Sequence, residues 1–142
     1  MGESVAVREI PDAGWARLRS AAAAALERAY APYSGYRVGA AALTEDGRLV
    51  AGCNVENASH GVTLCAECAL VGELHMGGGG RLAAFVCLGG DGRVITPCGR
   101  CRQLLWEFHA PGMAVLTPAG VLPVDALLPQ AFGPEDLAAA SQ

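Results

Sequence analysis

The chain has 142 residues, of which 52% are hydrophobic, and its formal net charge is −4. This length fits a single domain, residues 1–142, with a sizeable core. A nucleic-acid groove needs clustered Lys and Arg, so this charge disfavours a polynucleotide partner, and no apolar run approaches the roughly 18 residues of a membrane span.

The first half of the chain predicts a helix, a strand hairpin and a polar loop. Apolar residues recur at helical spacing over Asp12–Tyr30, and Asp12 is placed to cap that helix. Small and apolar residues over Tyr36–Thr44 favour a buried strand, which a turn joins to a second strand, Leu49–Cys53. The polar segment Asn54–Thr63 is predicted to be a loop.

The second half predicts two helices that flank an apolar strand. A helix is expected over Leu64–Met76, because four glycines end the pattern abruptly. Leu82–Leu88 lacks alternation, which is typical of a strand covered on both faces. After a brief extension at Val94 and Ile95, the remaining expected elements are a helix at Cys98–Phe108, short strands at Ala114–Leu116 and Val121–Val124, a segment capped by Asp125, and a C-terminal helix.

Helices thus alternate with strands in the order α-β-β-α-β-α-β-β. This order predicts the α/β class, as a three-layer α/β/α sandwich with a central mixed sheet of about five strands. Ligands are expected beyond the ends of the strands.

Six cysteines in a chain that opens without a recognisable signal peptide indicate a reducing, cytoplasmic location and metal binding rather than disulfides. Cys98 and Cys101 have the spacing that lets one helical turn hold one ion, and Cys65 is a candidate third ligand. Three thiolates favour zinc and leave the fourth tetrahedral position open, as in catalytic sites. Glu67 is then expected to carry protons rather than to bind the metal.

A closed site is the competing interpretation of the same cysteines. Cys65 and Cys68 form a second Cys-x-x-Cys pair, and together with Cys98 and Cys101 they match a structural four-cysteine zinc site. Such a site would stabilise an interaction module without catalysis. Spacing alone leaves both geometries open.

The order Cys65-Ala66-Glu67 followed by Pro97-Cys98-Gly99-Arg100-Cys101 is the signature of zinc deaminases. Over nearly its whole length the chain resembles the cytidine deaminases, the small homotetrameric zinc-dependent class. Further blocks carry the resemblance: Pro32-Tyr33-Ser34 with Val38-Gly39-Ala40, Gly52-Cys53-Asn54-Val55-Glu56-Asn57-Ala58, Arg102-Gln103 and Leu127-Leu128-Pro129-Gln130-Ala131-Phe132.

The resemblance implies one Zn²⁺ per subunit, held by Cys65, Cys98 and Cys101. It implies hydrolytic deamination of cytidine and deoxycytidine to uridine and deoxyuridine plus ammonia, a reaction of pyrimidine salvage. Glu67 would move the protons, taking one from water and delivering protons to N3 of the pyrimidine and to the leaving amine.

The resemblance also implies substrate contacts. The backbone amide of Ala66 would contact the base carbonyl, Asn54 and Glu56 would bind the sugar, and Tyr36 would pack on the base. Phe132 would come from a neighbouring subunit to close the pocket, which implies a homotetramer.

The chain departs from the family pattern at two positions. Cys68 stands where many members carry Arg directly after the catalytic Glu, and His60 stands where many carry Tyr. Because the sulfur ligands then lack that Arg, we hypothesise that Arg102 donates hydrogen bonds to a ligand thiolate. An alternative activity is deamination of an antibiotic nucleoside such as blasticidin S, but the Asn54–Asn57 block favours a plain ribose.

Overall fold

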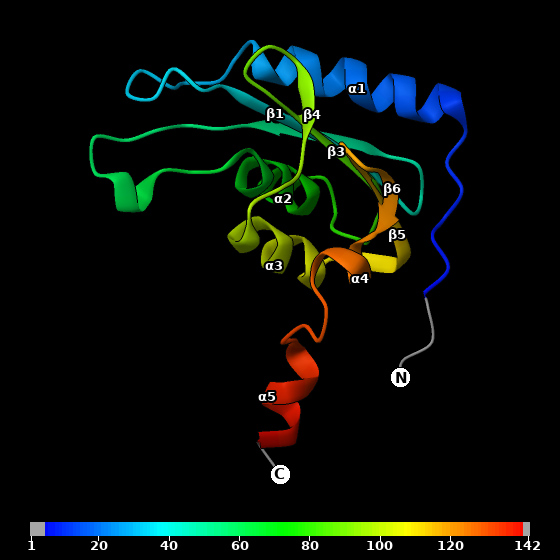
Figure 1. Ribbon diagram of the computed structural model, residues 1–142. Helices are drawn as coiled ribbons and strands as arrows, with labels where there is room; N and C mark the ends of the chain where they lie inside the picture. Colours follow the sequence, from blue (N-terminus) through cyan, green and yellow to red (C-terminus); the bar gives the residue numbers. More distant parts are fainter. Residues whose placement is uncertain (1–4, 141–142) are drawn as a thin grey trace.

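The computed structural model describes residues 5–140 and has three layers (Figure 1). The strands are β1 (Val38–Thr44), β2 (Leu49–Cys53), β3 (Leu82–Gly89), β4 (Arg93–Ile95), β5 (His109–Thr117) and β6 (Gly120–Pro123). The helices are α1 (Asp12–Leu26), the 3₁₀ turn η1 (His60–Val62), α2 (Ala66–Met76), α3 (Gly99–Glu107), α4 (Val124–Leu127) and α5 (Pro134–Ala140). The predicted α/β/α sandwich is confirmed.

The mixed sheet has the order β2-β1-β3-β5-β6, with β4 also paired to β3. Among the described strands, only β3 and β5 run parallel, and the other pairs are antiparallel. β5 and β4 lie along successive stretches of β3: Phe85 is opposite Val115 of β5, whereas Cys87 is opposite Ile95 of β4. The chain therefore leaves β4 where β3 changes partners, and residues 96–98 lead from that point to α3.

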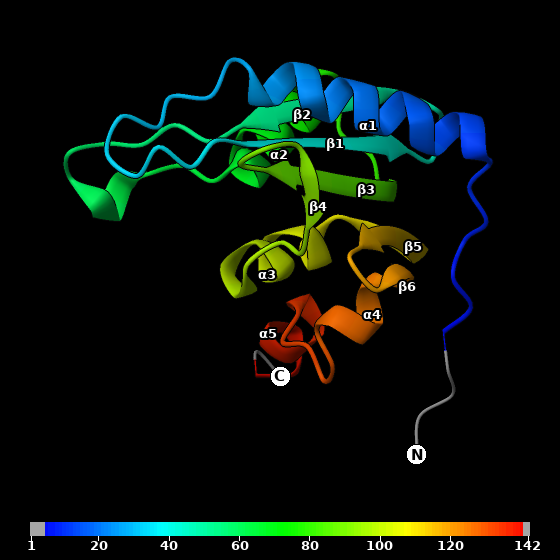
Figure 2. The ribbon, with the colours of Figure 1, turned by 45° about the horizontal axis from the view of Figure 1, so that its top comes forward.

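The layers bury β3 along its whole length, as its uninterrupted apolar sequence predicts. α1 covers one face of the sheet, and α2 and α3 cover the other (Figures 1 and 2). The core accordingly forms two clusters: one includes Leu18 and Val86 beneath α1, and the other includes Leu70, Phe85 and Leu105 beneath α2 and α3.

Two glycines let these helices approach the sheet closely. A Cβ on Gly39 of β1 would lie 2.0 Å from the carbonyl oxygen of Ala22 in α1. A Cβ on Gly52 of β2 would lie 2.4 Å from the carbonyl oxygen of Ala66, the first residue of α2. On both faces of the sheet a glycine thus allows a helix to pack closely against a strand. On one face, this close packing sets the position of the start of α2.

The structure corrects the predicted limits of several elements. α1 ends at Leu26 rather than Tyr30, because Tyr30 instead pairs with Val55 in an isolated bridge. Asp12 and Asp125 are not caps, since each lies inside its helix, after Pro11 and after Val124 respectively.

Within residues 5–140 the sheet has six strands rather than about five, because the brief extension at Arg93–Ile95 pairs with β3. β5 begins at His109, five residues before the predicted strand. Pro111 and Gly112 hide this start in the sequence, and Gly112 has a φ of 72°. The backbone N–H of Arg8, in the N-terminal segment, donates to the Gly112 carbonyl at 2.8 Å.

The loop between α1 and β1 and the loop between β2 and α2 run side by side and project beyond the sheet (Figures 1 and 2). The backbone N–H of Tyr30 donates to the carbonyl of Asn54 (3.0 Å), and that of Glu56 donates to the carbonyl of Tyr30 (2.8 Å). These two hydrogen bonds join the loop that follows α1 to the loop that follows β2. Within residues 5–140, no helix combines the length and the apolar character needed to cross a membrane.

Candidate metal centre and cavity

Two helix N-termini converge on three cysteines. Cys65 is the N-cap residue of α2, Cys98 is the N-cap residue of α3, and Cys101 lies in the first turn of α3. The three Sγ atoms lie within 4.8 Å of one another. The partial positive charge at each helix start favours anionic sulfur at these positions. The structure therefore brings together the three cysteines that the sequence singled out.

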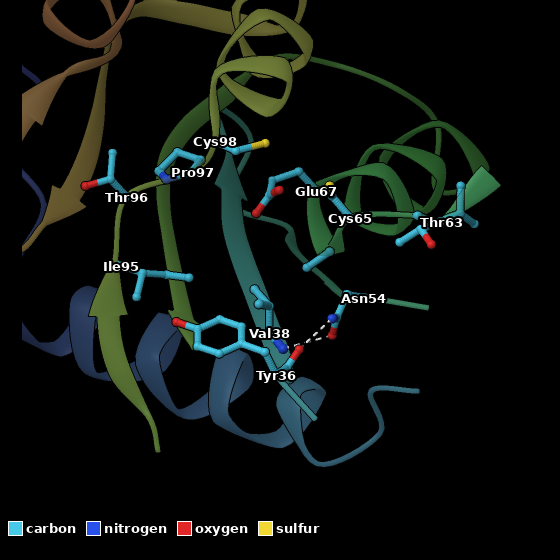
Figure 3. Close-up of a pocket in the computed structure, with 12 residues that line it drawn as sticks. Tyr36, Val38, Asn54, Thr63, Cys65, Glu67, Ile95, Thr96, Pro97 and Cys98 are labelled. Carbon is cyan, nitrogen blue, oxygen red and sulfur yellow. Dashed lines mark hydrogen bonds between the residues drawn. The ribbon is translucent and has the colours of Figure 1, made fainter. Parts of the chain in front are cut away.

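A cavity of about 260 Å³ opens beside this cluster (Figure 3). Glu67 extends into it between Cys65 and Cys98, and its side chain is buried, with only 4% of the residue exposed. Of the predicted substrate contacts, Tyr36, Asn54 and Ala66 line the cavity. The lining residues that sequence reasoning did not select are Val38, Thr63, Leu64, Ile95, Thr96 and Pro97.

Burial dominates the electrostatics of the cluster. It raises the pKa of Cys101, and the neighbouring carboxylate of Glu67 adds to this rise. Burial likewise raises the pKa of Cys65 and that of Glu67. Burial would also raise the pKa of Cys98, but the backbone amide and thiol of Cys101 outweigh it, so this pKa lies below its ordinary value.

The donor set fits zinc. Three sulfurs and a carboxylate lie close together in a partly buried site, and they cannot all be ionised there unless a cation offsets their charge. Thiolates are soft ligands that favour zinc, and three of them leave one tetrahedral position free. Among the described residues, Cys68 does not join the group of three sulfurs. The closed four-cysteine interpretation is therefore wrong for this geometry.

Asn54 and Tyr36 shape the opposite wall of the cavity. The backbone N–H of Val38 donates to Asn54 Oδ1 (2.8 Å), and Asn54 Nδ2 donates to the carbonyl of Tyr36 (2.9 Å), as Figure 3 shows. The ring of Tyr36 lies over Gly89, where an added Cβ would be 2.4 Å from the phenol oxygen. The buried amide of Asn54 therefore fixes the strand entry that carries Tyr36.

Glu56 lies outside the cavity lining and organises the neighbouring loop. Its carboxylate accepts hydrogen bonds from the backbone N–H groups of Tyr33 (3.0 Å) and Ser34 (3.1 Å) and from Ser34 Oγ (2.5 Å). The Ser34 hydroxyl in turn accepts from the backbone N–H of Tyr36 (2.9 Å). His60 packs edge-on against Tyr33, with ring centroids 6.0 Å apart.

Phe132 also lies outside the cavity lining. It is 56% exposed and sits between α4 and α5, where its carbonyl accepts a hydrogen bond from Gln103 Nε2 (2.9 Å). Within one chain, the structure does not bring Phe132 to the cysteine cluster.

The hypothesis that Arg102 donates to a ligand thiolate is corrected. Arg102 Nε donates to the carbonyl of Pro97 (2.8 Å), and Nη1 donates to the carbonyl of Leu127 (3.4 Å). The guanidinium that reaches sulfur belongs to Arg100, whose Nη1 lies 3.9 Å from Cys65 Sγ. The charges of Cys68 and Cys65 raise the pKa of Arg100. Sequence reasoning missed this residue.

The two cysteines outside the cluster differ from each other. Cys87 is fully buried in β3, and its thiol donates to the carbonyl of Ile95 (3.2 Å). Cys53, at the end of β2, is only half-buried.

Comparisons with known proteins agree with this site. The family model described as "Cytidine and deoxycytidylate deaminase zinc-binding region" matches residues 16–117. Cytidine deaminase of Mycobacterium tuberculosis (strain CDC 1551 / Oshkosh) is 53% identical over 128 residues, which cover 90% of this chain and 96% of that protein.

Solved structures are similar as well. The crystal structure of cytidine deaminase from Mycobacterium tuberculosis matches with a TM-score of 0.82 and 52% identity, covering 87% of this chain and 99% of that chain. The enzyme from Mycobacterium leprae matches with a TM-score of 0.81 and 51% identity, covering 84% of this chain and all of that one, 100%.

Proposed function

The chain belongs to the cytidine deaminase family, and from this membership we propose that it catalyses hydrolytic deamination of cytidine and deoxycytidine to uridine or deoxyuridine and ammonia. One observation carries the proposal: three cysteine sulfurs gather within 4.8 Å, and the buried carboxylate of Glu67 enters the same cavity. The enzyme is a hydrolase, and zinc is its cofactor.

We assign Cys65, Cys98 and Cys101 as the ligands of one Zn²⁺ per chain. When bound, zinc supplies a Lewis acid that lowers the pKa of water to about 7, so that a nucleophile is available at neutral pH. The two helix starts hold the three sulfurs in place and favour their negative charge. Cys68, which lies outside the group, has no ligand role in this assignment.

Glu67 is the proton carrier. Its carboxylate takes a proton from the water whose oxygen bonds to C4 of the base, and it delivers that proton to N3. It then moves the proton of the new C4 hydroxyl to the amino group, so that the C4–N bond breaks and ammonia leaves. The C4 carbonyl of the product forms in the same step. Burial of Glu67 keeps bulk water away from these transfers.

The cavity wall orients the nucleoside. We place the base between the Ala66 backbone amide, which binds the base carbonyl, and the ring of Tyr36. Asn54 binds the sugar through the hydrogen-bonding capacity that its contacts at Tyr36 and Val38 leave unused, and Glu56 binds it from the loop beside the cavity. Since these contacts do not depend on the 2′-hydroxyl, the ribo- and deoxyribonucleoside are both substrates.

The working unit in this proposal is a homotetramer. An exposed Phe132 on a segment held by α3 supports it, because a ring in that position can reach a neighbouring subunit's pocket. Six unpaired cysteines support a reducing compartment, so we place the enzyme in the cytoplasm, in pyrimidine salvage.

The test is the loss of cytidine absorbance near neutral pH, run with cytidine, deoxycytidine, cytosine and blasticidin S side by side. The expected result is turnover of both nucleosides, with little turnover of free cytosine because it lacks a sugar. Turnover of blasticidin S alone would assign the site to an antibiotic nucleoside. No turnover of any of the four by the zinc-loaded protein would contradict the proposal.

A further inference from the structure

The sulfur ligands need a positive partner. Three thiolates and one Zn²⁺ leave a net charge of about −1, and the carboxylate of Glu67 lies in the same pocket. A metal centre with this excess of negative charge is a weak Lewis acid unless neighbouring groups offset it. Cys68 stands directly after Glu67, where many family members carry an arginine, so this chain must offset the charge in another way.

Arg100 is the cation that the fold places at the sulfurs. It lies in the first turn of α3, between Cys98 and Cys101, and its Nη1 donates to Cys65 Sγ at 3.9 Å. That contact crosses from α3 to the cap of α2. A cation in the first turn of a helix opposes the helix dipole and is therefore unfavourable there. The adjacent sulfurs give a reason for a cation at this unfavourable position.

The sequence contains no lysine, so a permanently charged side-chain cation at the sulfurs must be an arginine. Arg102, the nearest alternative, gives its donors to the carbonyls of Pro97 and Leu127. Across residues 5–140, Arg100 is the one arginine whose side chain donates a hydrogen bond to a cysteine sulfur.

We propose that Arg100 is a positioning residue that supplies, from α3, the positive charge that many family members supply from the residue after the catalytic Glu on α2. The proposal rests on the proposed function, because it takes Cys65, Cys98 and Cys101 as the zinc ligands. Arg100 holds Cys65 at the cluster and offsets the sulfur charge, so it tightens zinc binding.

The test measures zinc affinity directly, by competition with a coloured chelator, in Arg100→Lys, Arg100→Gln and Arg100→Ala. Exposed Arg19 of α1, across the sheet, provides the matched control Arg19→Ala. The visible absorption of the cobalt(II)-substituted proteins reports thiolate coordination independently of activity. Thermal melting of the zinc-free proteins confirms that each variant folds.

We expect zinc affinity to fall by about 10 to 100-fold in Arg100→Gln and Arg100→Ala, the usual range for loss of a group that contacts a ligand. The thiolate absorption should shift in both. Arg100→Lys, which keeps the charge, should retain most of the affinity, and Arg19→Ala should match the wild type. Adding Cys68→Arg to Arg100→Ala should restore part of the affinity.

A wild-type protein that binds no zinc would defeat the proposed function itself. If the wild type binds zinc and Arg100→Gln has the same affinity and the same cobalt spectrum, this inference alone is overturned. It is also overturned if Arg100→Lys is as weak as Arg100→Gln, since charge would then not be the cause.

Discussion

The close approach of β2 and α2 at Gly52 predicts that one methyl group there will disturb the metal centre. In Gly52→Ala the added Cβ would lie 2.4 Å from the carbonyl oxygen of Ala66 and 2.5 Å from the backbone nitrogen of Leu70. Both are backbone atoms, so no side chain can rotate away. To restore an ordinary contact of 3.4 Å, the first turn of α2 must retreat by about 1 Å.

Such a retreat is large for a metal site. Ala66 stands between Cys65 and Glu67, whereas metal–ligand distances tolerate shifts of about ±0.2 Å. Misplacement by 1 Å can lower a rate by about 10²-fold. We therefore expect Gly52→Ala to weaken zinc binding and to lower kcat by about 10²-fold, beyond an overpacking cost of about 1 to 3 kcal/mol in folding stability.

Gly39→Ala is the matched control. Its Cβ would lie 2.0 Å from the carbonyl oxygen of Ala22, so the overlap is at least as severe, but it displaces α1 on the other face of the sheet. This variant should lose stability in urea unfolding and yet keep its zinc affinity and its kcat per folded molecule. If Gly52→Ala loses stability but keeps both zinc and kcat, the contact does not set the metal centre and the reasoning fails.

Three further substitutions separate other roles. Glu67→Gln should keep its zinc but lower kcat by about 10⁴-fold, the upper end for acid–base catalysis, because one group handles several transfers; loss of zinc in a metal assay would refute the role. Phe132→Ala should raise KM with zinc content unchanged, and a fully active monomer in light scattering would exclude the proposed subunit contact. Arg48→Ala removes the donors to the carbonyls of Gly77 and Gly79 beyond the far end of α2, so it should lower the free energy of unfolding by about 1 to 2 kcal/mol and leave zinc and kcat unchanged; a change in zinc affinity would contradict this.

The sequence was sufficient where chemistry depends on local spacing. Cys98 and Cys101 lie on one turn in any helix that begins at Pro97, so their proximity follows from the spacing alone. The uninterrupted apolar run of β3 likewise indicates a strand with helices on both faces. The third sulfur ligand, Cys65, was predicted from the motif and not from local spacing, because only the packing of α2 beside α3 brings it close to the other two sulfurs.

The sequence was insufficient where direction in space decides. Arg100 and Arg102 both flank Cys101, and their order along the chain does not reveal which one reaches a sulfur. On a helix, residues two apart point about 200° away from each other, so one faces the cap of α2 and the other faces α4. The early start of β5 was missed for a related reason: Pro111 and Gly112 are poor strand residues that the neighbouring backbone nevertheless accommodates.

The nine residues of α3 hold two parts of the structure in place, the sulfur cluster and the C-terminal segment. Its first turn contributes Cys101 to the sulfur cluster, and the next two residues, Arg102 and Gln103, hold the backbone of Leu127 and Phe132. The metal ligands and the C-terminal segment therefore depend on the same short helix. Redesign of the C-terminal segment for a new substrate will therefore also disturb the helix that carries metal ligands. Substitutions at Tyr36, on the cavity wall, do not act on α3. The cavity wall is therefore the safer place to begin such a redesign.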